Sequence, residues 1–228
     1  EEGKLLDKED LAKSFMSRGL TRSTIKDITG ALEDFDRGIE IRERLIEAGK
    51  LLDENYFAKT YIYRGVAKKK IEDILGAIKD FDRAIDIRER LMEAGKLIDE
   101  NDLAKVYRNR GDARIIITDI PGAMDDFKKA IEIREKLILK EIRLDLRGHL
   151  YILCFDYLSL VLDNEKEDII LITLKNILNM IYKCIHLDKT DEVEADLLRE
   201  LCDMVSDEAS LPDEVKVEWL KLKQRLRK

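Results

Sequence analysis

The chain has 228 residues, of which 40% are charged and only two are proline, and its formal net charge is −7. This composition favours long helices with apolar stripes, and the low aromatic content of 6% argues against an all-β fold. The excess of acidic residues is concentrated in residues 148–228, so the chain lacks the strongly basic character of a nucleic-acid-binding domain.

Residues 1–9 are predicted to be the end of a truncated upstream repeat. The sequence EEGKLLD at 1–7 matches EAGKLLD at 47–53 and EAGKLID at 93–99, so we interpret it as a linker that follows a helix further upstream. The same step of 46 residues separates glycines, alanines, phenylalanines and aspartates along the chain: Gly19, Gly65 and Gly111; Ala31, Ala77 and Ala123; Phe35, Phe81 and Phe127; Asp27, Asp73 and Asp119. A fixed period of this size indicates a stacked repeat array.

The repeats are expected at residues 10–54, 55–100 and 101–141, each with two helices. In the second repeat, apolar residues at helical spacing predict helix A over 56–71 and helix B over 74–94. Asp73 is placed to cap the start of helix B, and Asp27 and Asp119 occupy the same position in the other repeats. Gly49 and Gly95 are predicted to end helix B in a left-handed conformation.

These residues resemble the pattern of the tetratricopeptide repeat (TPR) family, in which small residues let two antiparallel helices pack closely beside an aromatic side chain. The resemblance covers about residues 10–140 and implies an all-α, TPR-like α-solenoid of antiparallel helix pairs. The period of 46 residues exceeds the family's usual length of about 34, so we expect helices of roughly 16–21 residues. Arginines precede the repeat glycines, and we predict three pairs with helix B: Arg18–Asp34, Arg64–Asp80 and Arg110–Asp126.

The repeat pattern stops after the third copy. Four apolar-periodic segments follow, at about 142–162, 165–186, 191–206 and 211–227, and we interpret residues 142–228 as a C-terminal helical capping region. Trp219, the single tryptophan, is expected to be a packing anchor in the last segment.

The sequence contains no motif for catalysis, cofactor binding or metal binding, so we predict a protein that is not an enzyme. Cys154 and His149 lie five residues apart, and Cys184 and His186 two apart, so each pair diverges on a helix. Cys154, Cys184 and Cys202 are interpreted as small buried side chains. Free cysteines and the absence of a long apolar segment favour a cytoplasmic protein without a membrane partner.

The TPR resemblance implies that helix A lines a concave groove that binds a protein or peptide partner. The expected lining includes a ladder of lysines and the residues beside it on helix A: Lys13, Met16, Ser17 and Leu20; Lys59, Ile62, Tyr63, Val66 and Lys69; Lys105, Arg108, Asn109 and Asp112. The lysines suggest a partner that is acidic or that presents a C-terminus. Equally, they are consistent with solvated residues that descend from duplication of the repeat.

Two further functions stay open besides a peptide-binding scaffold. The chain could form a homo-oligomer through its apolar helices, or it could be the docking or sensor arm of a larger protein. RNA binding is the least favoured function because the chain as a whole is acidic.

Overall fold

A computed structural model describes residues 2–50, 53–140, 144–185, 192–207 and 211–225. These residues form helices joined by short turns, and no strand occurs among them. The chain divides into two compact units, residues 1–119 and 120–228. The division falls between the two helices of the predicted third repeat.

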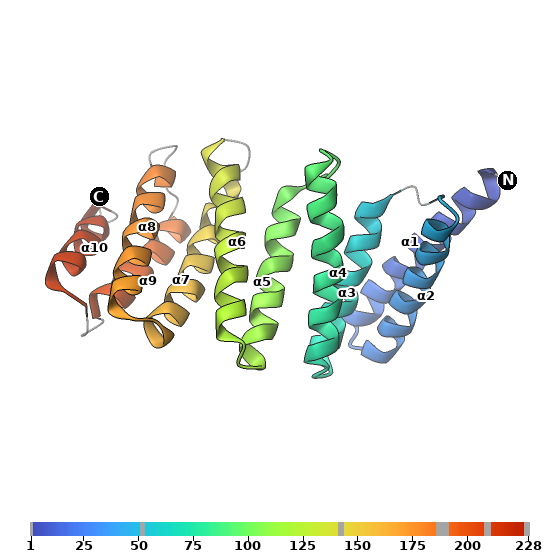
Figure 1. Ribbon diagram of the computed structural model, residues 1–228, viewed down its shortest axis with the longest axis horizontal. Helices are drawn as coiled ribbons and strands as arrows, with labels where there is room; N and C mark the ends of the chain where they lie inside the picture. The colour runs from blue at the N-terminus through green and yellow to red at the C-terminus, as the bar shows by residue number, and fades with distance from the viewer. Residues whose placement is uncertain (1, 51–52, 141–143, 186–191, 208–210, 226–228) are drawn as a thin grey trace. The chain divides into compact units, whose positions relative to one another are not determined.

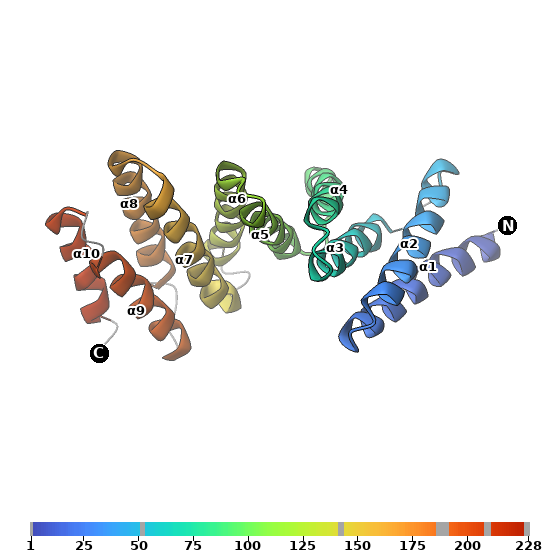
Figure 2. The ribbon, with the colours of Figure 1, turned by 90° about the horizontal axis from the view of Figure 1, so that it is seen from below.

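The first unit contains five helices in the described residues, arranged as antiparallel neighbours (Figure 1). They are α1 (Glu2–Thr24), α2 (Ile28–Glu47), α3 (Glu54–Lys70), α4 (Ile74–Glu93) and α5 (Glu100–Ile116). In Figure 2, α2 and α4 lie in one layer and α1 and α3 in another. The helices α3 and α4 agree with the predicted ranges 56–71 and 74–94 to within two residues.

Close packing of each helix pair depends on a glycine in the first helix. A Cβ atom added to Gly65 would lie 2.7 Å from Phe81 Cε1, and one added to Gly19 would lie 2.7 Å from Phe35 Cε1. Both phenylalanines are completely buried. The glycines therefore leave the space that the aromatic rings fill, as the TPR resemblance implies.

The turn between α3 and α4 is closed by Asp73, whose carboxylate accepts a hydrogen bond from the Gly76 amide at 3.0 Å. Asp27 caps α2 in the same way. The residue before each cap, Lys26, Glu72 or Thr118, has a positive φ between 61° and 66°. The predicted caps at Asp27 and Asp73 are confirmed, and the cap at Asp119 stays a prediction.

The turns that follow α2 and α4 use glycine instead. Gly49 and Gly95 each have a φ of 65°, which confirms the predicted helix ends. The next helices begin after Asp53 and Asp99, whose side chains accept hydrogen bonds from backbone amides of the first turn.

The helix α1 starts at Glu2, so residues 2–9, expected to form a linker, are helical. Gly3 lies inside α1, whereas Gly49 ends a helix. The same Lys-Leu-Leu sequence follows both glycines, and glycine permits a left-handed turn without requiring one.

The second unit contains α6 (Ile120–Leu139), the short 3₁₀ helix η1 (Leu144–Leu146), α7 (Arg147–Asn164), α8 (Glu167–Ile185), α9 (Glu192–Asp207) and α10 (Asp213–Arg225). The helices α7 to α10 correspond to the four predicted segments. Trp219 is completely buried, which confirms its expected role in packing. None of the described helices is long and apolar enough to cross a membrane.

Candidate functional site

The predicted groove residues lie on α1, α3 and α5, and we call the side that carries Lys13, Lys59 and Lys105 the helix-A surface. Most of the other predicted lining residues are partly or fully exposed there: Ser17, Leu20, Ile62, Tyr63, Val66, Lys69, Arg108, Asn109 and Asp112. The structure brings residues of neighbouring helices together through side-chain contacts along this surface.

Met16 is the exception, because only 6% of it is exposed. It packs in a core cluster with Ala31, Phe35 and Ala67. Its position in α1 faces α2, so it cannot contribute contact area to a partner. Leu20 and Tyr63 pack against the edge of the same cluster and remain partly accessible.

Tyr56 lies between two lysines of the predicted ladder. Lys13 Nζ is 5.0 Å from the centroid of the Tyr56 ring, and Lys59 Nζ is 5.8 Å from it. Both distances are within the range of cation–π attraction. Tyr56, which is half-buried, therefore joins α1 to α3 on this surface.

Asp102 is the point where positive side chains converge. Its carboxylate oxygens lie 3.1 Å from Lys105 Nζ, 3.4 Å from Arg88 Nη2 and 3.9 Å from Lys59 Nζ. Arg88 is buried and is also attracted by the charge of Asp99, so Lys59 and Lys105 are the cations of this cluster that a partner can reach.

A further set of contacts joins the same helices near their other ends. Lys69 Nζ lies 3.8 Å from an oxygen of Asp112, and Lys70 Nζ donates a hydrogen bond to Ser23 Oγ at 3.0 Å. Lys69, which the sequence places on the groove, and the adjacent Lys70 therefore have partners on the neighbouring helices. The helix-A surface is a network of mixed charges with local basic points rather than a uniform basic face.

Arginines between the two helix layers form the predicted pairs. Arg18 donates to both oxygens of Asp34, at 2.8 and 2.6 Å, and Arg64 donates to both oxygens of Asp80, at 2.9 and 2.6 Å. The hydrogen bonds from Arg18 hold the pKa of the Asp34 carboxyl below its ordinary value. Arg110 and Asp126 belong to different units, and their pairing stays a prediction.

Each arginine of a later repeat also reaches back to the preceding one, which the sequence did not reveal. Arg64 Nη1 donates to Asp36 at 2.7 Å, and Arg110 Nη1 donates to Asp82 at 2.6 Å. Burial lowers the pKa of Arg64, but the hydrogen bonds and charges of Asp80 and Asp36 more than offset this effect and raise it. These arginines link successive helix pairs.

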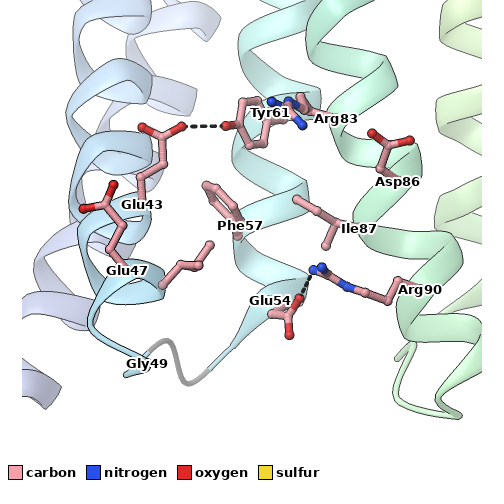
Figure 3. Close-up of a pocket in the computed structure, with 11 residues that line it drawn as sticks. Glu43, Glu47, Gly49, Glu54, Phe57, Tyr61, Arg83, Asp86, Ile87 and Arg90 are labelled. Carbon is pink, nitrogen blue, oxygen red and sulfur yellow. Dashed lines mark hydrogen bonds and ion pairs between the residues drawn. The ribbon is translucent and has the colours of Figure 1, made fainter.

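A cleft lies on the opposite side of α3, between α2 and α4 (Figure 3). Its volume is about 610 Å³, and Phe57 and Tyr61 of α3 form its floor. Tyr61 donates a hydrogen bond to Glu43 at 3.0 Å, and Arg90 pairs with Glu54. Sequence reasoning missed this cleft because its charged residues have the spacing of an ordinary solvated helix face.

The described residues contain no group of three or more side chains that could hold a metal ion. His149 is exposed, whereas Cys154 is buried, and His186 lies outside the described residues. Burial raises the pKa of all three cysteine thiols, to about 11 for Cys184 and about 12 for Cys202. The cysteines act as buried apolar side chains, as predicted.

No protein-family model matches the sequence, and no curated protein resembles it closely enough to be recognised. Solved structures do match the fold. A putative kinesin light chain from Podosopora anserina with nearly identical TPR-like repeats is 12% identical, with a TM-score of 0.59, over 96% of this chain and 95% of the other. BtubC (BKLC) from P. vanneervenii is also 12% identical, with a TM-score of 0.61, over 97% of this chain and 82% of the other.

The similarity extends over nearly the whole length of this chain, and the glycine–phenylalanine packing and the repeated caps agree with it. The protein therefore has an all-α, TPR-like repeat fold.

Proposed function

We propose that the chain is a non-catalytic scaffold that binds a protein or peptide segment on the helix-A surface. The observation that carries this proposal is the placement of two accessible lysines, Lys59 and Lys105, beside the single carboxylate of Asp102. Lys59 and Lys105 share this one carboxylate and keep part of their side chains exposed, so a further negative group can approach them. An acidic side chain or a C-terminal carboxylate of a partner has the complementary charge.

Tyr56 supports the proposal because it offers an aromatic contact beside this charge. Tyrosine is among the residues that contribute most to binding energy at protein interfaces. Its two neighbouring lysines, Lys13 and Lys59, would contact the polar part of the same segment. Ile62 and Val66 add partly exposed apolar area on α3.

The test is an affinity capture from native cell extract, read by mass spectrometry. The helix-A variant combines Lys13→Gln, Lys59→Gln and Lys105→Gln, which remove three charges and keep good helix formers. The control variant combines Lys26→Gln, Lys50→Gln and Lys79→Gln, three exposed positions away from this surface. Circular dichroism verifies that both variants are folded.

A partner that the wild type and the control retain and the helix-A variant loses would support the proposal. Equal capture by both variants would contradict a role for the three lysines. If none of the proteins captures a partner, sedimentation at increasing concentration tests self-association as the alternative. The proposal places the protein in the cytoplasm, supported by three free and buried cysteines of the kind found in a reducing compartment.

A further inference from the structure

The cleft between α2 and α4 carries an excess of unpaired acidic side chains on its rim. Within the described part of the chain, Glu47, Asp86 and Arg83 make no ion pair, while Arg90 is engaged by Glu54. Glu43 uses one carboxylate oxygen for Tyr61, which leaves its second oxygen available. The groups that remain to meet a ligand are therefore three carboxylates and one guanidinium.

The floor and walls of the cleft add apolar contact area. Phe57 and Ile87 are buried at its base, and Ile46 is 45% exposed at its edge. Figure 3 shows Glu43 and Glu47 on the α2 side and Arg83, Asp86 and Arg90 on the α4 side, with the floor residues between them. A volume of 610 Å³ is within the range of ligand pockets, about 300–1,000 Å³.

At neutral pH the phenol of Tyr61 keeps its proton and donates a hydrogen bond to Glu43. Burial raises its pKa to about 12, and the adjacent Glu43 carboxylate acts in the same direction. This hydrogen bond fixes Glu43 at the rim with its negative charge, so one wall of the cleft presents a positioned carboxylate rather than a freely rotating one.

We propose that this cleft binds a short segment of a partner protein in which a lysine or arginine stands beside an aliphatic side chain. The aliphatic side chain would lie against Phe57, Ile87 and Ile46. The basic side chain would meet Glu47, Asp86 and the available oxygen of Glu43. This cleft lies on the other side of α3 from the helix-A surface. Its proposed ligand is basic, whereas the ligand proposed for the helix-A surface is acidic.

Charge complementarity favours a basic segment over an acidic one. An acidic segment would face three carboxylates and find only Arg83 without a partner, and like charges brought together across an interface oppose binding. An uncharged apolar segment would leave the carboxylates desolvated without compensation.

The experiment selects phage-displayed random short peptides on the immobilised full chain and then measures the affinity of the enriched peptides by fluorescence anisotropy. The cleft variant combines Glu47→Lys and Asp86→Lys, both on exposed helix positions. The control combines Glu33→Lys and Glu72→Lys, which change the net charge equally. Lys26 already occupies the place of Glu72 one repeat earlier with nearly the same φ, so the control is compatible with the fold. Ile46→Ser separately reduces the apolar contact.

We expect enrichment of peptides with a lysine or arginine beside an aliphatic residue. Their affinity should fall roughly tenfold or more in the cleft variant, a change of about 1.4 kcal/mol per factor of ten, and stay unchanged in the control. Ile46→Ser should weaken peptide binding. The affinity should still depend on salt concentration as in the wild type, because the charged residues of the cleft remain.

Several results would overturn the proposal. These are no enrichment of peptides with a lysine or arginine, or equal weakening of such peptides in the cleft and control variants. Acidic peptides lost by the lysine-to-glutamine helix-A variant would belong to the other surface. A concentration-dependent dimer of the wild type that the cleft variant abolishes would identify a second copy of the chain as the occupant instead.

Discussion

Arg64 connects three helices, because it donates to Asp80 of α4 and to Asp36 of α2 from its own position on α3. Asp80 is nearly completely buried, whereas Asp36 is 62% exposed. Breaking a fully buried ion pair costs about 3–5 kcal/mol, while an exposed pair contributes about 1 kcal/mol or less. The two partners of one arginine should thus differ strongly in their effect on stability.

We predict that Arg64→Met lowers the free energy of unfolding by about 2–3 kcal/mol. The loss stays below that of a fully buried pair because Lys68 remains 2.9 Å from Asp80. Asp36→Asn, the matched control, should cost less than about 1 kcal/mol. Urea denaturation followed by circular dichroism measures both, and equal stabilities of wild type and Arg64→Met would refute the structural role of the pair.

The ionisation of Tyr61 gives a second prediction at the level of single residues. Its pKa is raised from 10.0 to about 12 in the folded chain. The folded state therefore favours the protonated phenol, and this contribution to stability is fully present below pH 10 and is lost as the pH rises to about 12.

Spectrophotometric titration should show a tyrosine that ionises near pH 12 in the wild type and is missing in Tyr61→Phe. The stability of the wild type should also fall between pH 10 and 12 more steeply than that of Tyr61→Phe. Identical slopes in the two proteins would show that Tyr61 ionises normally.

At the scale of helix pairs, two glycines should respond to alanine in opposite directions. Gly65→Ala places a Cβ atom 2.7 Å from the buried Phe81 ring and should destabilise the fold by about 1–2 kcal/mol. A Cβ atom added to Gly38 would lie 3.3 Å from the carbonyl oxygen of Ala12, which needs a shift of only a few tenths of an ångström, and alanine stands at its position in the next two repeats, as Ala84 and Ala130. Gly38→Ala should be neutral or stabilise by up to about 1 kcal/mol, since alanine favours helix.

Urea midpoints of the two variants measure this difference. A loss of stability in Gly38→Ala as large as in Gly65→Ala would mean that the first helix pair is packed more tightly than the second.

The helices and caps were predictable because they depend on local features. Helical spacing of apolar residues, an aspartate three residues before a backbone amide and a glycine at the helix end act within a few residues. The pairs Arg18–Asp34 and Arg64–Asp80 were predictable because the repeat places the same charges opposite each other in every copy.

Features that join neighbouring repeats were not predictable in this way. Arg42 is completely buried and reaches both Glu9 and Thr60, although its sequence context is that of a solvated helix face. The convergence of cations on Asp102 joins α3, α4 and α5 and depends on how one helix pair packs on the next. A single sequence contains no direct signal for that packing.

At the scale of the whole chain, the two units should respond separately to a local change. In a repeat array, stability depends on each unit and on its nearest neighbours. Trp219, the only tryptophan, is completely buried in α10 and so reports on the second unit alone. Circular dichroism reports on all helices.

We predict that Gly65→Ala shifts the urea transition measured by circular dichroism to lower concentration, and shifts the transition measured by Trp219 fluorescence less. Coincident transitions in both proteins would instead indicate two-state unfolding of the entire chain. The control is Gly38→Ala, which should leave the order of the two transitions unchanged.

The turns between helices have nearly identical backbone geometry from one repeat to the next. Lys26, Glu72 and Thr118 share one left-handed conformation, and Gly49 and Gly95 share another instance of it. A duplicated stretch of 46 residues that begins and ends at equivalent turns would thus enter the chain in the direction that the existing helices already follow. Gene duplication could lengthen this protein by whole repeats without inventing a new turn, and a designer could extend it by the same route.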